Sequence, residues 1–267
     1  MLPISDCDPA VLAPLRDLMD ADHPARVGKV VAEGAECVRW LLQSDLQVEL
    51  VVGKATVLAA LGPELAARAG TVTSVVADQA ALSALVGFRC TRGVVACGQR
   101  PHQPTVDALL GDCVQPRLLV LDAVHDPGNV GGLIRSARCL GVDAVVLGPG
   151  CADPFYRRAV RVSVGHVFQL PVVSVPDLGP VFACLEQAGV CILAAHRGPM
   201  AAALETIQAP PSWALVLGNE DRGPSPQAVQ ACHHHVAIPM APGVDSLNVA
   251  VAGAIIMHWL ARAERGT

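Results

Sequence analysis

The sequence lacks an apolar segment long enough to cross a membrane, although its mean hydropathy of +0.44 is high. A transmembrane helix needs about 20 apolar residues, and the longest candidate, Val249–Leu260, is shorter and contains His258. The first residues, MLPISDCDPA, have no basic stretch followed by an apolar one, so they fit neither a signal peptide nor a transit peptide. We therefore expect a cytoplasmic protein with no membrane partner.

Paired cysteine motifs are also absent. The ten cysteines contain no C-x-x-C pair, and 267 residues with 52% apolar content are enough to bury a core without disulfides. We expect reduced, buried thiols rather than disulfides or metal ligands. The run Cys232–His235 does not favour a metal site, because neighbouring residues on a strand point to opposite faces and do not converge easily on one ion. No metal is expected.

Several catalytic signatures are missing. The sequence contains no G-x-S-x-G, no Walker loop and no H-E-x-x-H, so hydrolase, nucleoside triphosphatase and zinc-protease functions have no support. The glycines of its most glycine-rich loop do not have the G-x-G-x-x-G spacing either. This disfavours a Rossmann oxidoreductase, which stays only as an alternative.

Lysine is scarce, because 17 of the 19 basic residues are arginine. The net charge of −5 at first disfavours a nucleic-acid partner, but residues 1–22 alone carry −4, which leaves −1 on the rest of the chain. Arginine is the cation that makes forked contacts with phosphate. The composition is therefore compatible with a local basic face and an RNA partner.

The apolar pattern divides the chain into two blocks, separated by the proline-bearing stretch 100–107. In the first block, strands are predicted at about 27–32, 47–52, 71–77 and 93–97, and helices at about 34–43, 54–68 and 78–86. In the second block, strands are predicted at 118–121, 144–147, 190–193, 214–217 and 236–238, and helices at about 129–140, 177–188, 224–231 and 246–263.

This order predicts an α/β protein with two domains. We assign residues 1–103 to an N-terminal domain that begins with the acidic segment 1–22, residues 104–115 to a linker, and residues 116–267 to a C-terminal domain. The near-continuously apolar strands of the second block indicate a parallel sheet, and such sheets bind ligands at the carboxyl ends of their strands. Chemistry is therefore expected in the loops after residues 121, 217 and 238.

The first of these loops carries Asn129 and Arg135 beside three glycines, Gly128, Gly131 and Gly132. Glycine lets the backbone approach a ligand or pack tightly at a helix start, and Asn129 stands where an N-cap belongs. The alternative interpretation is structural, with Asn129 as an ordinary cap and Arg135 as a solvated helix residue.

The second loop, 217–225, places Glu220 three residues after a strand end. An unpaired desolvated carboxylate is costly, so Glu220 needs a partner, for which Arg135 and Arg222 are candidates. The alternative is a turn with exposed charges.

The third loop, 238–248, leads into a strongly apolar helix. Asp245 or Ser246 is the candidate cap of this helix, which would place Asn248 inside the first turn. A polar side chain there usually serves a purpose other than helix propensity. Taken singly, each loop indicates little about function.

Together, the three loops closely resemble, in order and form, the signature motifs of the SpoU family of the SPOUT superfamily, whose members are RNA ribose 2′-O-methyltransferases. The resemblance covers essentially the whole second block. It implies an α/β fold whose C-terminal part threads into a deep trefoil knot, and S-adenosylmethionine as cofactor, held in a bent shape by the knot loops. More loosely, the first block resembles the family's N-terminal substrate-binding domain, which is similar to small RNA-binding ribosomal proteins.

The resemblance also implies roles for particular residues. The family's catalytic and substrate-positioning sites fall at Asn129, Arg135, Glu220, Ser246 and Asn248. Its cofactor positions and their neighbours fall at Leu217, Gly218, Asn219, Ile238, Met240 and Leu247. We expect Arg135 to clamp the phosphate beside the ribose rather than to act as a general base, because a guanidinium is effectively never deprotonated in proteins. Glu220 would then orient Arg135 or Asn129.

Structured RNA is the partner implied, either rRNA or tRNA with rRNA favoured, together with a second copy of the chain. The homodimer would use the apolar helix 249–260, which needs something to cover it. Between the first two motifs, one aromatic ring and three cations form a plausible RNA contact at Tyr156, Arg157, Arg158 and Arg161. The alternative for this segment is a solvated helix turn.

A non-catalytic RNA-binding or ribosome-assembly protein that keeps the knotted fold is the competing function. The presence of all five catalytic positions, from Asn129 to Asn248, counts against it.

Overall fold

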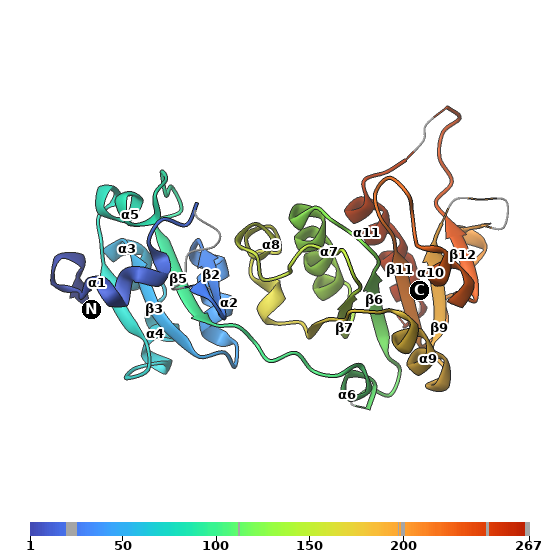
Figure 1. Ribbon diagram of the computed structural model, residues 1–267, viewed down its shortest axis with the longest axis horizontal. Coiled ribbons are helices and arrows are strands. Elements are labelled where there is room, and N and C mark those ends of the chain that lie inside the picture. The colour runs from blue at the N-terminus through green and yellow to red at the C-terminus, as the bar shows by residue number, and fades with distance from the viewer. Residues whose placement is uncertain (20–25, 112, 197, 199–200, 244–245, 265–267) are drawn as a thin grey trace. The chain divides into compact units, whose positions relative to one another are not determined.

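The computed structural model describes residues 1–19, 26–111, 113–196, 198, 201–243 and 246–264. The chain forms two compact units, Met1–His102 with Phe155–Gln169, and Gln103–Pro154 with Leu170–Thr267. Both combine helices with a sheet, so the predicted α/β class is confirmed (Figure 1). No helix in the described ranges is long and apolar enough to span a membrane.

The first unit contains a five-stranded sheet with the order β1-β4-β3-β5-β2. Its strands are β1 (Leu2–Pro3), β2 (Lys29–Glu33), β3 (Val48–Gly53), β4 (Thr73–Val76) and β5 (Val94–Gln99). β1, β4 and β3 are parallel, whereas β5 pairs antiparallel with β3 and β2. The helices are α1 (Pro9–Leu12), α2 (Ala35–Gln43), α3 (Ala55–Ala60), α4 (Gly62–Ala67), α5 (Gln79–Val86) and α8 (Arg157–Val162).

The predicted helix 54–68 is in fact two helices, α3 and α4. Gly62 and Pro63 open α4, and proline is tolerated in a first helical turn but removes a hydrogen bond from a helix interior. The four predicted strands of the first block correspond to β2, β3, β4 and β5, with boundaries shifted by a few residues.

Residues 155–169 pack within the first unit, although in the sequence they follow β7 (Ala144–Leu147), a strand of the second unit. Their backbone approaches α2 closely, because a Cβ on Gly165 would lie 3.0 Å from the Cα of Cys37. Gln169 donates a side-chain hydrogen bond of 3.1 Å to the carbonyl of Trp40. The proposed C-terminal domain 116–267 included this segment. Its contacts depend on residues more than 100 positions away, which a local pattern does not reveal.

The second unit contains a seven-stranded parallel sheet with the order β10-β12-β9-β11-β6-β7-β8. Its strands are β6 (Arg117–Leu121), β7 (Ala144–Leu147), β8 (Val172–Ser174), β9 (Cys191–Ala195), β10 (Ala202–Ala203), β11 (Trp213–Leu217) and β12 (His234–Ala237). The sequence predicted five of them. The two that it missed, β8 and β10, are strands of only three and two residues at the edges of the sheet.

Helices lie on both faces of this sheet, which explains why its strands are almost entirely apolar. α6 (Val106–Gly111), α9 (Gly179–Gln187) and α10 (Pro226–Ala231) pack on one face, over Leu118, Val120 and their neighbours. α6 falls within the predicted linker 104–115, and Val106, Leu109 and Leu110 give it an apolar side at helical spacing that packs against the core.

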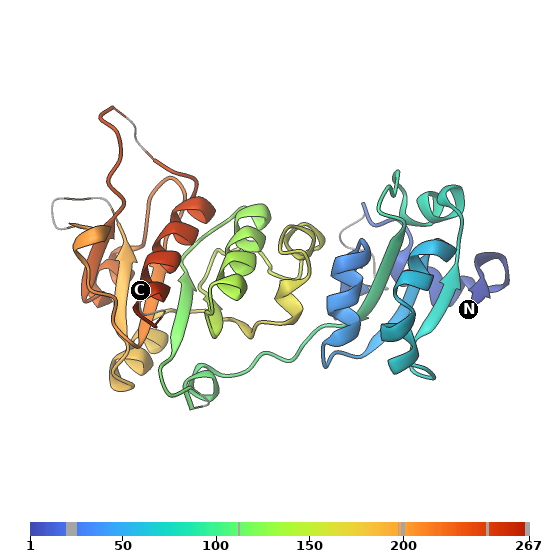
Figure 2. The ribbon, with the colours of Figure 1, turned by 180° about the vertical axis from the view of Figure 1, so that it is seen from behind.

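α7 (Pro127–Cys139) and α11 (Val249–Leu260) pack side by side in the second unit (Figures 1 and 2). Small residues let them approach closely. A Cβ on Gly132 would lie 3.3 Å from that of Ala250, and a Cβ on Gly253 would lie 2.5 Å from Leu133 and 2.6 Å from Leu217. These glycines therefore set the distance between the helices that carry Asn129 and Asn248.

All ten cysteines are free, as the sequence predicts, but only Cys7, Cys37, Cys90 and Cys97 are fully buried. Burial raises the pKa of Cys37 to about 11 and that of Cys97 to about 12, because it disfavours the charged thiolate. Cys139 is exposed.

We expect iodoacetamide at pH 8 to alkylate Cys139 rapidly and to leave Cys37 and Cys97 unmodified until the protein unfolds, because the thiolate is the reactive form. Mass spectrometry of peptides after timed labelling measures this. Equal rates at Cys139 and Cys97 in the folded protein would contradict the packing of the first unit.

Candidate functional site

The loops that follow β6, β11 and β12 come together at one edge of the second sheet. Parallel pairing aligns the ends of the first two strands, because Leu121 of β6 is the register partner of Leu217 of β11. β9 continues the alignment through Ala194, opposite Val216, and β12 through Val236, opposite Ala195. The three loops in which chemistry was expected therefore follow strand ends that lie at the same edge of the sheet.

A pocket of about 420 Å³ opens at this edge. All six residues implied as cofactor positions line it, and Glu220 and Ser246 lie on its wall as well. Much of the remaining wall is apolar, with contributions from Val236, Ala252 and Ile256. This volume and this mixture of apolar wall and a few polar groups are typical of a small-molecule site.

Gly218 directly follows β11 and leads into a tight hairpin at residues 219–223. Asn219 and Gly223 exchange two backbone hydrogen bonds of 3.1 and 2.9 Å, and the side-chain oxygen of Asn219 accepts from the backbone amides of Asp221 and Arg222. The Asn219 amide group also donates to the carbonyl of Ala123, at 3.0 Å. Asn219 therefore ties the β11 loop to the β6 loop.

Three of the five residues implied as catalytic form a chain of hydrogen bonds. The Asn248 amide donates to Oδ1 of Asn129 at 2.9 Å, and the Asn129 amide donates to Oε1 of Glu220 at 2.8 Å. The direction is fixed, because Oδ1 of Asn248 already accepts from the backbone amides of Ala250 and Val251 and an ionised carboxylate only accepts. Glu220 is thus paired with Asn129, not with Arg135 or Arg222.

The two helix caps differ from those expected. Asp126, not Asn129, accepts from the backbone at the start of α7, through the amide of Asn129 itself. Asn248, not Ser246, caps α11, and Asp245 lies outside the described residues. α7 begins two residues before Asn129, and α11 begins three residues after Ser246. Because Asp126 caps α7, the Asn129 side chain remains available to the site.

Arg135 and Ser246 are the other two implied catalytic residues. Arg135 lies on α7 and is exposed, with no side-chain hydrogen bond or ion pair to any residue of the described ranges. Ser246 is exposed at the pocket wall. Neither side chain is held by a hydrogen bond to another residue of the described ranges, in contrast with the side chains of Asn129, Glu220 and Asn248.

Residues 116–258 match the SpoU rRNA Methylase family. The chain belongs to this family. An uncharacterised tRNA/rRNA methyltransferase of Mycobacterium bovis is 35% identical over 262 residues, covering 96% of this chain and 90% of that protein. The 23S rRNA (guanosine-2′-O-)-methyltransferase RlmB of Yersinia pestis is 31% identical over 240 residues, covering 87% of this chain and 96% of RlmB.

A solved structure with the same fold is the AdoMet-bound rRNA methyltransferase of Sinorhizobium meliloti. It superposes with a TM-score of 0.79 and covers 99% of this chain and 97% of its own, at 24% sequence identity. At that identity, the similarity shows that this SpoU chain shares its α/β fold.

Three residues that contribute to the candidate site were not expected from the sequence. Asp122, directly after β6, is buried, and its Oδ2 accepts a 2.7 Å hydrogen bond from the backbone amide of Ser225, which positions the start of α10. Ala195 and His196 line the pocket from the end of β9. Parallel sheets bind ligands at the carboxyl ends of their strands, and β9 is one of these strands. The predicted end of β9 would therefore have indicated Ala195 and His196.

The four residues expected to bind RNA belong to the other unit of this SpoU chain. Tyr156 is exposed directly before α8, which begins at Arg157. Arg157 and Arg161 each contact Glu33, at 3.3 and 3.7 Å, and Arg158 is exposed. The segment is a helix turn, as its alternative interpretation proposed, but one with specific ion pairs.

The histidines that follow α10 make specific contacts within the second unit. Nδ1 of His233 accepts a 2.9 Å hydrogen bond from the backbone amide of Ile192, and the ring of His235 packs edge-on against His196, with 5.9 Å between centroids. Within the described part of the chain, no three His, Cys, Asp or Glu side chains are grouped so that they could hold a metal ion.

Gly218 is a position where even a methyl group does not fit. A Cβ there would lie 2.0 Å from the nitrogen of Pro224 and 2.1 Å from the carbonyl carbon of Gly223, which are backbone atoms. We expect Gly218→Ala to lower the free energy of unfolding by about 1–3 kcal/mol or more, because the hairpin must open. Urea unfolding measures this.

Gly62→Ala is the matched control, since a Cβ at Gly62 meets nothing within 4 Å. It should leave the stability nearly unchanged. A Gly218→Ala protein as stable as this control would show that the hairpin is not built as described.

Proposed function

We propose that this SpoU protein transfers a methyl group from S-adenosylmethionine to a ribose 2′-hydroxyl of structured RNA, with rRNA favoured. The observation that carries the proposal is the hydrogen-bonded chain Asn248–Asn129–Glu220, which fixes the orientation of three polar side chains and ends at Glu220 on the pocket wall. The name of the RlmB relative, a 23S rRNA 2′-O-methyltransferase, supports the choice of reaction and of rRNA.

The residues present fit the cofactor. Leu217, Ile238 and Leu247 would wall a purine ring, and the backbone at Gly218 lies on the same wall, where no side chain blocks it. Met240 and Asn219 complete the six cofactor positions that we assign. When bound, the cofactor would supply an electrophilic methyl group carried on a positively charged sulfur. A site of about 420 Å³ is large enough for a small-molecule ligand of this kind.

The chain's own residues then have to hold the ribose and the neighbouring phosphate. Arg135, exposed and without a partner in the described ranges, keeps all its donors for a phosphate oxygen, and a fixed positive charge there stabilises the charge that develops on the 2′-oxygen. Asn129 and Asn248 position the ribose, Glu220 fixes Asn129, and Ser246 contacts the substrate end. Positioning of this kind supplies a large part of the rate of a bimolecular transfer.

We also propose that the C-terminal chain is knotted and that the protein is a homodimer. The knot is supported by the loops after β9, β11 and β12 meeting around a single pocket. The dimer is supported by an apolar patch on α11, where Val251 and Ile255 lie one helical turn apart and are 49% and 40% exposed.

Methyl transfer from radiolabelled cofactor to rRNA, followed by mapping of 2′-O-methyl sites, tests the proposal. We expect Arg135→Ala to lower the rate about 100-fold or more and Arg135→Lys to be nearly as poor, because a point charge does not replace a fork. Binding of S-adenosylmethionine, measured by calorimetry, should stay close to that of the wild type.

Arg138→Ala removes another exposed arginine from the same helix and should leave the rate unchanged. A wild-type protein that binds S-adenosylmethionine but methylates no RNA would overturn the proposed activity. Normal transfer by Arg135→Ala would overturn the role of Arg135 alone.

The dimer has its own test. Val251→Glu with Ile255→Glu should shift the protein from dimer to monomer in light scattering at micromolar concentration, because two charges would be buried at the interface. The control Gln187→Glu with Gln230→Glu adds the same charge at exposed sites on α9 and α10 and should remain dimeric. A monomeric wild type would contradict the proposal.

A further inference from the structure

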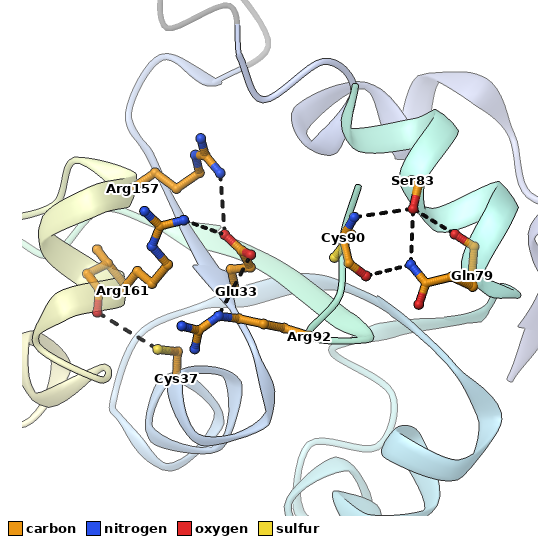
Figure 3. Close-up of polar contacts among 9 residues, drawn as sticks. Glu33, Cys37, Gln79, Ser83, Cys90, Arg92, Arg157 and Arg161 are labelled. Atoms are coloured by element: carbon orange, nitrogen blue, oxygen red, sulfur yellow. Dashed lines mark hydrogen bonds and ion pairs between the residues drawn. The ribbon is translucent and has the colours of Figure 1, made fainter. Parts of the chain in front are cut away.

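Glu33, at the carboxyl end of β2, is a buried carboxylate contacted by three arginines (Figure 3). Nη1 of Arg157 donates to Oε2 at 3.3 Å, and Nη1 of Arg161 lies 3.7 Å from the same oxygen. Nε of Arg92, from the loop before β5, lies 4.0 Å from Oε1. All four residues belong to the first unit.

The cluster carries excess positive charge. One carboxylate neutralises one of three guanidinium groups, which leaves a local charge of +2 in a protein whose net charge is −5. The Glu33 side chain is only 5% exposed, whereas Arg92 and Arg161 are 51% and 36% exposed. The excess charge is therefore presented to solvent by these two arginines.

Arg92 is held in place by its loop. The side chains of Gln79 and Ser83 bind the backbone of Cys90, at 2.6 and 3.2 Å, and so fix the turn that leads to Arg92 (Figure 3). Gly34, with φ of +94°, makes room for the arginine stem, since a Cβ there would lie 3.0 Å from Cδ of Arg92.

Arg157 differs from the other two. It is only 22% exposed, it makes the one hydrogen bond to Glu33, and its guanidinium lies 4.8 Å from the centre of the Phe88 ring. It therefore anchors α8 to the sheet of the first unit. Arg92 and Arg161 are beyond hydrogen-bond distance from Glu33 and make no other side-chain hydrogen bond within the described ranges, so their donors remain available.

We propose that Arg92 and Arg161, oriented by Glu33, bind a phosphate of the RNA substrate, and that the exposed ring of Tyr156, the residue directly before α8, stacks on a base. The proposal rests on the proposed function, because it takes RNA as the substrate. Two guanidinium forks suit phosphate oxygens, and an exposed aromatic ring next to cations suits an unpaired base. Arg157 is then a positioning residue rather than a phosphate ligand.

The experiment measures binding of the full chain to an rRNA fragment by fluorescence anisotropy over a range of salt concentrations. Arg92→Ala and Arg161→Ala should each flatten the slope of log affinity against log salt by about 0.7–0.9, and the double variant by about twice that. Tyr156→Ala should weaken binding with little change in slope.

Arg39→Ala is the matched control. It removes the same charge from the same unit, but Arg39 is paired with Glu36 and Glu64 and so should not contact phosphate. Its slope should equal that of the wild type. A double Arg92/Arg161 variant with the wild-type slope would overturn the proposal.

Glu33→Gln gives a test of opposite sign. It removes one negative charge from the protein, so affinity for RNA would rise if the only effect of Glu33 were to reduce the local positive potential. If Glu33 orients the arginines, affinity should fall about tenfold instead, and Glu33→Asp should recover part of it. A rise in affinity with Glu33→Gln would contradict the orienting role, and thermal unfolding of each variant identifies loss of the folded first unit.

Failure of this proposal can be told apart from failure of the proposed function. Unchanged salt slopes with normal methyl transfer would leave the enzyme intact and remove only this phosphate site. Altered slopes without any methyl transfer by the wild type would leave an RNA-binding protein and remove the activity.

Discussion

The amide group of Asn248 has one oxygen and one NH₂ group, and the structure of the site follows from how these are used. The oxygen caps α11, so only the NH₂ group is left for the neighbouring loop. Asn129 must then accept with its own oxygen and donate to Glu220. One helix cap thus fixes the orientation of side chains from three loops.

That arrangement depends on the close approach of α7 and α11. A Cβ on Gly132 would lie 3.3 Å from that of Ala250, and a Cβ on Gly253 would lie 2.5 Å from the Leu133 side chain, so a larger residue at either position would crowd the contact between the helices. The 2.9 Å hydrogen bond between Asn248 and Asn129 spans this same contact. Packing and chemistry are therefore coupled, and a core substitution between these helices acts on the site at a distance.

In the first unit, a carboxylate has the corresponding organising role. Glu33 is buried at the end of β2 and draws together arginines from α8 and from the loop before β5. A buried charge without partners would be strongly destabilising, so the cations are required for the strand end to fold as it does. Because three arginines contact one carboxylate, the cluster that stabilises the fold also carries an excess positive charge for an anionic ligand.

The α/β class, the parallel strands of the second block and the three loops of the candidate site could be predicted from local patterns in the sequence. Apolar runs and strand ends are local signals, and Asn129, Glu220 and Asn248 lie in the segments that follow such runs. The motifs were also specific enough to indicate the SpoU family, to which the chain belongs.

Which side chains pair with one another follows only from the three-dimensional arrangement of the chain. Local patterns placed both helix caps a few residues from their true positions, and left the partner of Glu220 open among charged residues when it is the neutral Asn129. They also did not show that residues 155–169 pack with the first unit, where Arg157 lies 124 positions from Glu33. The physical reason is the same in each case. A hydrogen bond or ion pair depends on distance and direction in space, and these are set by strand register and helix packing between segments far apart in the chain.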